Sequence, residues 1–240
     1  MDWREEFEIA EETVAGRRAV IALPPPGTAN GKWALKTEYY DAFPAVQCAL
    51  LRQGYHVAHI SNKTRWHCME DDLARAALVR HMQSRYGVSE KCVIIGMSCG
   101  GLQGIYFASD FPQYVSCMYL DAPVVNFLSC PAGLGKSEIP LDAMEEFQRD
   151  TGMGITELLS YRDHPLDRIP SLVKHNVPII LVSGDSDITV PYEENGKLLE
   201  DAYVRAGGDL KVILKPGGDH HPHSLEDNTP ILDFIRQYDK

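Results

Sequence analysis

The sequence predicts an α/β protein with a mostly parallel central sheet and helices on both faces. Short apolar runs rich in β-branched residues alternate with segments of helical periodicity along the chain, which is the order typical of such a fold. One of these runs, 92–97, ends in a Gly-x-Ser-x-Gly turn that a helical segment follows at once. A chain of 240 residues that is 44% hydrophobic is large enough for one such domain.

The amino-terminal half begins with a predicted hairpin. Residues 5–14 and 18–23 form two strands joined near Gly16, and Pro24-Pro25-Pro26-Gly27 ends the second strand. No element is expected again until residue 41. From there the patterns predict a helix over 41–53, a strand over 55–60 and a helix over 69–86, with Gly54 and Gly87 closing the two helices.

The carboxy-terminal half continues the alternation. The strand over 92–97 and its helix are followed by a strand at 117–120, which ends in Asp121-Ala122-Pro123. The remaining predicted elements are a strand at 177–182, a helix at 192–206, a strand at 210–214 and a helix at 225–238.

Residues 124–176 interrupt this alternation. The stretch contains two loops with glycine and proline and two short helical patterns, at 141–149 and 155–161. It is too long for a simple connection between two strands of one sheet. We therefore expect a single domain over residues 1–240 with a lid inserted at about 124–176.

The composition argues against several classes of function. The formal net charge of -11 is unfavourable for binding nucleic acid or an anionic membrane surface. The chain begins Met1-Asp2-Trp3 without an apolar leader, and no apolar run approaches the roughly 20 residues of a membrane span. The cysteines form no Cys-x-x-Cys pair, which favours free thiols in a reducing compartment. We expect a cytoplasmic protein, and the sequence leaves its oligomeric state open.

A serine, an acid and a histidine follow three of the predicted strands, in that order. Ser98, Asp187 and His220 each lie shortly after such a strand. Because functional groups gather at the carboxyl ends of parallel strands, we expect these side chains to meet. A serine hydroxyl needs an imidazole to accept its proton and a carboxylate to orient that imidazole. The three residues therefore predict nucleophilic catalysis by serine.

Three motifs resemble those of the α/β-hydrolase superfamily, and the match spans almost the whole chain. Gly96-Met97-Ser98-Cys99-Gly100 resembles the family's nucleophile elbow, which implies that Ser98 is the nucleophile. The loop 184–191 resembles its Gly-x-x-Asp-x-x-Val-Pro loop, which implies that Asp187 is the acid. The segment 216–220 resembles its Pro-Gly-x-Gly-His loop and implies that His220 is the base, although Asp219 stands where a second glycine is usual. The resemblance implies the α/β-hydrolase fold.

The acid has two alternatives. Asp185 lies in the same loop as Asp187, which would then cap the turn. Asp121 lies at the end of another strand, from which some superfamily members take their acid. Asp187 is favoured by its position in the motif.

The base also has alternatives, because His221 and His223 lie close to His220. The run His-His-x-His is also compatible with a metal, since imidazoles are common zinc ligands. No further ligand with suitable spacing is evident, so we expect neither a metal nor another cofactor.

An acyl-transfer site also needs hydrogen-bond donors for the oxyanion. The backbone N–H of Cys99, the residue after the serine, is the first, and the Cys99 side chain is expected to pack. The second donor is expected from the loop after the strand that ends at Leu23. The three prolines at 24–26 have no N–H to donate, which leaves Gly27 or Thr28 as the nearest donor.

Three loop residues are expected to bind the substrate: Trp33, Lys36 and Trp66. Aromatic rings suit stacking on sugars or aryl groups, and a lysine can meet a carbonyl or carboxylate. The alternative is that they are ordinary surface loop residues. The segments 31–36, 41–45 and 220–227 resemble short serine esterases related to prolyl-oligopeptidase-type hydrolases, several of which are linked to carbohydrate use. That resemblance implies an ester of a sugar, such as an O-acetyl group.

The sequence therefore predicts a serine carboxylesterase that acts through an acyl-enzyme on a small-molecule ester, with an acylated sugar as the implied substrate. Two alternatives stay open. One is a catalytically silent α/β-hydrolase fold used for binding. The other is an acyltransferase or aminopeptidase that uses the same three residues.

Overall fold

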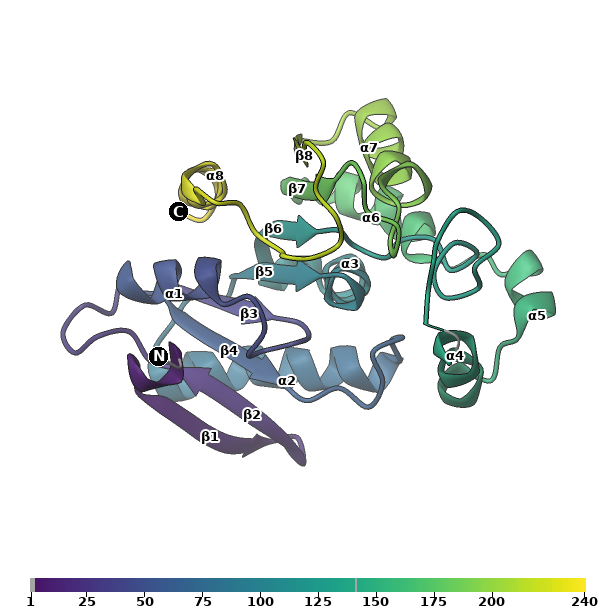
Figure 1. The fold of residues 1–240 in the computed structure, drawn as a ribbon. Coiled ribbons are helices and arrows are strands. Elements are labelled where there is room, and N and C mark those ends of the chain that lie inside the picture. The colour runs from purple at the N-terminus through teal and green to yellow at the C-terminus, as the bar shows by residue number, and fades with distance from the viewer. Residues whose placement is uncertain (1–2, 141) are drawn as a thin grey trace.

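Eight strands form one sheet in the computed structural model, which describes residues 3–140 and 142–240 (Figure 1). The order along the sheet is β1-β2-β4-β3-β5-β6-β7-β8. Strands β3 to β8 run parallel, whereas β1 pairs with β2 and β2 with β4 in antiparallel fashion. The mostly parallel sheet and the amino-terminal hairpin are thus confirmed. The strands are β1 (Ile9–Val14), β2 (Arg17–Ala22), β3 (Trp33–Lys36), β4 (His56–Ile60), β5 (Cys92–Met97), β6 (Val115–Asp121), β7 (Ile179–Gly184) and β8 (Leu210–Lys215).

Helices cover both faces of the sheet, as predicted. Apolar residues of α1 and α8 pack on one face, and those of α2, α3, α6 and α7 pack on the other (Figure 1). No helix in the described part of the chain is long and apolar enough to cross a membrane. The helices are α1 (Ala45–Arg52), α2 (Met69–Tyr86), α3 (Cys99–Asp110), α4 (Ala143–Thr151), α5 (Ile155–Ser160), α6 (Ile169–Lys174), α7 (Gly196–Arg205) and α8 (Thr229–Tyr238).

The two faces of β5 show how the core is divided. Successive side chains of a strand point to opposite faces of a sheet. Ile94 accordingly packs with α2 and α3, whereas Val93 and Ile95 pack with α1 and α8. Both faces are fully buried, which is why this strand reads as a continuous apolar run and not as an alternating one.

The absence of an element between residues 27 and 40 is a wrong prediction, because Trp33–Lys36 is the strand β3. It lies between β4 and β5 in the middle of the sheet, with Leu35 beside both Ala58 and Ile94. The strand has only four residues and ends in a lysine, so its pattern is too short and too polar to predict a buried strand. All four residues are nevertheless fully buried.

Three helices begin four residues later than predicted. The segments at 41 and 225 first form turns and bends, the segment at 192 first forms a 3-10 helix over Tyr192–Glu194, and the α-helices begin at Ala45, Gly196 and Thr229. Phe43, within the predicted helix 41–53, has a left-handed φ of 47°, which a helix does not accept. The predicted starts are wrong because hydrophobic periodicity continues into these turns.

The predicted lid contains two helices that lie away from the sheet, α4 and α5 (Figure 1). They cover a separate apolar cluster that includes Phe127, Phe147 and Leu158. The third helix of the stretch, α6, instead packs Ile169 and Leu172 into the main core. Within this stretch, α4 and α5 thus pack on a separate cluster, and α6 packs on the main core. Leu141, the predicted first residue of a helix, and residues 1–2 of the predicted domain lie outside the described residues.

Candidate active site

Ser98 lies on a sharp turn between β5 and α3. Its φ of 53° is rare for a residue with a side chain and strains the backbone. Close contacts explain the glycines on either side. A Cβ atom on Gly96 would lie 2.7 Å from the carbonyl oxygen of Gly100, and one on Gly101 would lie 2.4 Å from Cβ of Pro123. The turn therefore needs glycine at these positions, and it presents Ser98 at the carboxyl edge of the sheet.

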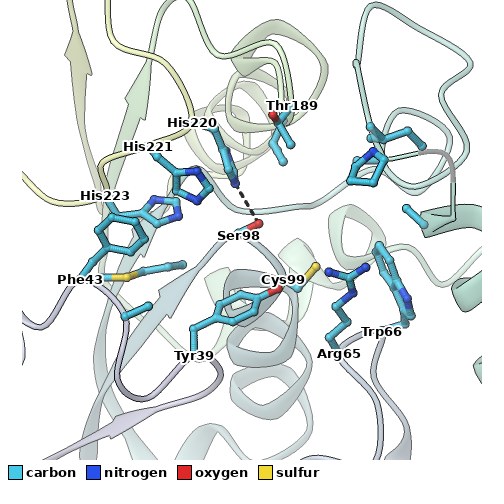
Figure 2. A pocket seen from close by; sticks show the side chains of 17 residues that line it. Tyr39, Phe43, Arg65, Trp66, Ser98, Cys99, Thr189, His220, His221 and His223 are labelled. Atoms are coloured by element: carbon cyan, nitrogen blue, oxygen red, sulfur yellow. Dashed lines mark hydrogen bonds between the residues drawn. The ribbon is translucent and has the colours of Figure 1, made fainter.

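Ser98, His220 and Asp187 form a continuous chain of hydrogen bonds. His220 Nε2 lies 3.1 Å from Ser98 Oγ (Figure 2). His220 Nδ1 lies 2.7 Å from Asp187 Oδ2. His220 and Asp187 are each only 5% exposed, so water competes little for these bonds. The fold thus brings together the three residues that follow β5, β7 and β8.

Backbone donors hold the Asp187 carboxylate in place. Its Oδ1 accepts the N–H of Thr189 at 2.9 Å and that of Val190 at 2.8 Å. These two bonds leave Oδ2 directed at His220. The loop after β7 therefore fixes both the position and the orientation of this carboxylate.

Asp185, the alternative acid, has another place in the site. Its Oδ1 accepts the N–H of Gly217 at 2.7 Å and so joins the loop after β7 to the loop after β8. Asp219, at the position where the superfamily usually has glycine, accepts the backbone N–H of His220 at 2.7 Å. Both acids therefore support the histidine loop, while the His220 ring is bonded to Asp187.

Asp121 and His223 form a second carboxylate–imidazole pair beside the first. His223 Nδ1 lies 2.8 Å from Asp121 Oδ1, and Asp121 Oδ2 accepts the Tyr119 hydroxyl at 2.5 Å and the Ser224 N–H at 2.7 Å. Burial alone would raise the pKa of Asp121. The hydrogen bond from His223 and its charge, together with the Tyr119 hydroxyl, outweigh burial and lower that pKa. The alternative acid is thus paired with the alternative base.

A cavity of about 330 Å³ opens in front of Ser98. Its wall is mostly apolar, and Figure 2 shows the side chains that surround Ser98 and His220. The wall comes from the loop after β3, the loop after β4, the start of α3, the segment around α4 and the loops after β7 and β8. The lining residues are Tyr39, Ala42, Phe43, Arg65, Trp66, Met97, Ser98, Cys99, Cys130, Ile139, Pro140, Ala143, Thr189, Val190, His220, His221 and His223.

Trp66 is brought to this cavity as expected, together with its neighbour Arg65. The Trp66 ring packs edge-on against Phe147 of α4 at a centroid distance of 5.4 Å. The Arg65 guanidinium lies 5.0 Å from the Trp66 ring centroid and donates a hydrogen bond to Glu146, also of α4. The loop after β4 and α4 therefore form one side of the cavity together.

Trp33 and Lys36 are not brought to the cavity, and the substrate-binding role predicted for them is wrong. Both belong to β3 and are fully buried. The Trp33 indole donates to the carbonyl of Ser89 at 2.9 Å. The Lys36 ammonium donates to the Gln47 side chain at 2.7 Å and to two backbone carbonyls of the loop 40–42. Both side chains thus have structural partners.

Gly27 and Thr28 also lie away from the cavity, so neither can donate to the oxyanion. Because β2 runs antiparallel to β4, its carboxyl end lies at the amino end of the parallel strands. The loop after β2 consequently lies at the opposite edge of the sheet. Its neighbour there is Gly54, whose carbonyl accepts the N–H of Asn30 at 3.0 Å.

Tyr39, in the loop after β3, is a lining residue that the sequence pattern does not indicate. It has a φ of 52° and lies beside Cys99 and Arg65 at the cavity wall (Figure 2). Burial raises the pKa of the Tyr39 phenol, so its hydroxyl keeps its proton and can donate it in a hydrogen bond. Burial likewise raises the pKa of the Cys99 thiol to about 11. A prediction of β3 beside β5 would place the loop with Tyr39 near Ser98. The sequence pattern does not indicate β3, so it gives no signal for Tyr39.

Comparisons with known proteins bear on the family and the fold. A family model described as "Prolyl oligopeptidase family" matches residues 56–239. That range contains Ser98, Asp187 and His220.

Solved structures share the fold at low sequence identity. A puromycin hydrolase is 17% identical, with a TM-score of 0.69 over 90% of this chain and 36% of its own. An acylaminoacyl peptidase of Pyrococcus horikoshii is 12% identical, with a TM-score of 0.72 over 97% of this chain and 42% of its own. Dipeptidyl peptidase 4 of Porphyromonas gingivalis is 15% identical, with a TM-score of 0.67 over 97% and 35%. This chain thus spans less than half the length of each.

Proposed function

The chain belongs to the prolyl oligopeptidase family, and from that premise we propose that it is a serine hydrolase that cleaves a carboxylic amide or ester through an acyl-enzyme. The observation that carries the proposal is the chain of hydrogen bonds from Ser98 through His220 to Asp187, at 3.1 and 2.7 Å. This arrangement activates a serine hydroxyl, because the imidazole accepts its proton while the carboxylate orients the ring.

The proposed reaction has two halves. Ser98 Oγ attacks the substrate carbonyl carbon as its proton passes to His220 Nε2, and His220 then gives that proton to the leaving amine or alcohol. A water molecule next attacks the acyl group on Ser98 while His220 removes the proton of the water. The acid product leaves, and Ser98 regains its proton from His220. These steps call for no cofactor.

Two donors are proposed for the oxyanion. The first is the backbone N–H of Cys99, the first residue of α3. The second is the Tyr39 hydroxyl, which replaces the donor expected from Gly27 or Thr28. Its support is the position of Tyr39 in the loop after β3, which lies beside β5, and its place in the same cavity wall as Ser98.

A short peptide or aminoacyl amide is the preferred substrate in this proposal. The similar structures are called puromycin hydrolase, acylaminoacyl peptidase and dipeptidyl peptidase 4. These names favour the aminopeptidase alternative over the ester of a sugar. The cavity of about 330 Å³ is at the small end of ligand pockets, which suits one apolar side chain or acyl group.

The substrate panel that tests this proposal contains amino-acid p-nitroanilides, dipeptide p-nitroanilides, p-nitrophenyl acetate and acetylated sugars. We expect hydrolysis of at least one p-nitroanilide, and loss of that activity in Ser98→Ala. Hydrolysis of acetylated sugars alone would instead support the hypothesis of a carbohydrate esterase. Absence of turnover together with absence of fluorophosphonate labelling at Ser98 would support the silent fold. Product analysis with competing alcohols and amines separates hydrolysis from acyl transfer.

A further inference from the structure

Three histidine side chains gather at one end of the cavity: His220, His221 and His223 (Figure 2). One nitrogen from each can be chosen so that all three lie within 4.8 Å of one another. The ring centroids are 4.7 to 5.0 Å apart, and each pair of rings is close to perpendicular. Only His220 is needed for the proposed reaction, so the other two rings call for a separate explanation.

The hydrogen bonds of this cluster leave two nitrogens suited to bind a metal. His220 and His223 each use Nδ1 toward a buried carboxylate, Asp187 at 2.7 Å and Asp121 at 2.8 Å. A carboxylate that accepts Nδ1–H fixes the tautomer with the lone pair on Nε2 and makes that nitrogen more basic. Zinc-binding histidines in proteins are commonly supported in this way.

His221 adds a third nitrogen. It is exposed, and its ring stacks on Phe43 at a centroid distance of 5.2 Å. In a tetrahedral site with Zn–N bonds of about 2.1 Å, the nitrogens lie about 3.4 Å apart. The chosen nitrogens, which lie within 4.8 Å of one another, therefore have to approach by at most about 1.4 Å to bind one ion.

We propose that His220, His221 and His223 bind one divalent transition-metal ion, best matched by Zn²⁺, and that the bound ion inhibits the enzyme. The inhibition rests on the proposed function, in which His220 Nε2 accepts the proton of Ser98. A metal bound to that nitrogen takes the same lone pair, so Ser98 loses its base. The ion is thus an inhibitor and not a catalytic cofactor.

Binding is tested first, because it does not depend on activity. Full-length protein without a histidine tag is titrated with Co²⁺, whose visible spectrum reports tetrahedral nitrogen ligands, and with Zn²⁺ by calorimetry. We expect one ion per chain. His221→Gln should weaken binding at least about tenfold, and His223→Gln should do the same. His175→Gln changes an exposed histidine outside the cluster and should bind like wild type.

Several results of the titration would overturn the site. The first is that wild type shows no saturable binding of the ion. The second is that His221→Gln and His223→Gln, both folded by circular dichroism, bind the ion as tightly as wild type. Equal weakening in His175→Gln would mean nonspecific binding, which also overturns it.

Inhibition is tested second, with fluorophosphonate labelling of Ser98 and with the best p-nitroanilide. Zn²⁺ should slow both in wild type, EDTA should restore them, and His221→Gln should need at least about tenfold more Zn²⁺. Undiminished labelling or hydrolysis by protein saturated with Zn²⁺ would overturn the inhibitory role. A protein that binds Co²⁺ as expected but neither labels nor hydrolyses would instead refute the proposed function and leave the metal site standing.

Discussion

His223 Nδ1 lies 2.8 Å from Asp121 Oδ1, and this pair repeats beside the active site the arrangement of His220 and Asp187. Only the His220 ring has its second nitrogen at hydrogen-bond distance from Ser98, at 3.1 Å. Two similar pairs in one chain allow the acid and the base to be identified by matched substitutions.

The first prediction compares the two carboxylates. Asp187→Asn should lower kcat about 10⁴-fold, because the amide cannot hold the His220 ring in the required tautomer. Asp121→Asn, its matched control, should keep kcat within about tenfold of wild type, because Asp121 acts on His223. Steady-state kinetics on the best substrate measures both. Equal losses would contradict the assignment of Asp187 as the acid.

The second prediction concerns the nucleophile and the base. Ser98→Ala and His220→Ala should each reduce turnover by roughly 10⁴–10⁶-fold, since removing either member disables the unit. His221→Ala and His223→Ala should each retain most of the turnover, because neither ring is bonded to Ser98. Side-by-side kinetics decides the matter, and an active His220→Ala variant would eliminate His220 as the base.

The third prediction concerns the proposed oxyanion donor. Tyr39→Phe removes only the hydroxyl and should lower kcat by about 10²–10³-fold with little change in KM, because the bond is needed in the transition state. Tyr40→Phe is the control, since its buried hydroxyl donates to the carbonyl of Val57 at 3.1 Å. If the kcat of Tyr39→Phe equals that of Tyr40→Phe, Tyr39 is not the donor.

The fourth prediction concerns the buried lysine of β3. Burial lowers the pKa of Lys36 to about 7, whereas a lysine in an unfolded chain has a pKa of about 10.4. Between these values the unfolded state binds more protons, so the contribution of Lys36 to stability rises with pH. Below about pH 7 both states are protonated, and the penalty for burying the charge is complete and constant.

Lys36→Met tests this dependence. The free energy of unfolding of wild type minus that of the variant should increase from about pH 7 to about pH 10. Urea denaturation at several pH values measures this difference. A difference that is constant over the range would mean that Lys36 stays charged in the folded protein.

The fifth prediction concerns the close contact behind the serine turn. A Cβ atom on Gly101 would lie 2.4 Å from Cβ and 2.8 Å from Cα of Pro123, so Gly101→Ala should destabilise the fold by about 1–3 kcal/mol. Gly104→Ala, in the same helix, would place its Cβ atom 2.7 Å from Cγ2 of Ile94, and no backbone atom is among its close contacts. It should cost less, because its closest contact is longer and is made with a side chain alone. Denaturation midpoints that rank the other way would contradict this account.

The sequence predicts most of the order of strands and helices along the chain, for a clear physical reason. Strands such as β5 and β7 are buried on both faces and appear as uninterrupted apolar runs. The residues Ser98, Asp187 and His220 follow such runs, so their meeting at one edge of the sheet follows from the topology.

The errors in the predicted site follow from β3, which the sequence pattern does not predict. Four residues ending in Lys36 give too short a pattern for a strand, because the lysine is buried through hydrogen bonds to distant groups that the local sequence does not reveal. Without β3, the loop that follows it is not placed beside β5. Tyr39 is then missed, and Gly27 and Thr28 take its place in the prediction.

The wall of the cavity is divided between two parts of the chain. Ser98, Asp187 and His220 are held by the sheet and its loops, whereas Ile139, Pro140 and Ala143 on the far side belong to α4 and the segment before it. Polar bonds join that segment to the loop after β4, among them the bond between Thr64 and Asp150 at 2.9 Å. Evolution can therefore alter the choice of substrate by changing residues around α4, while the residues that break the bond stay as they are.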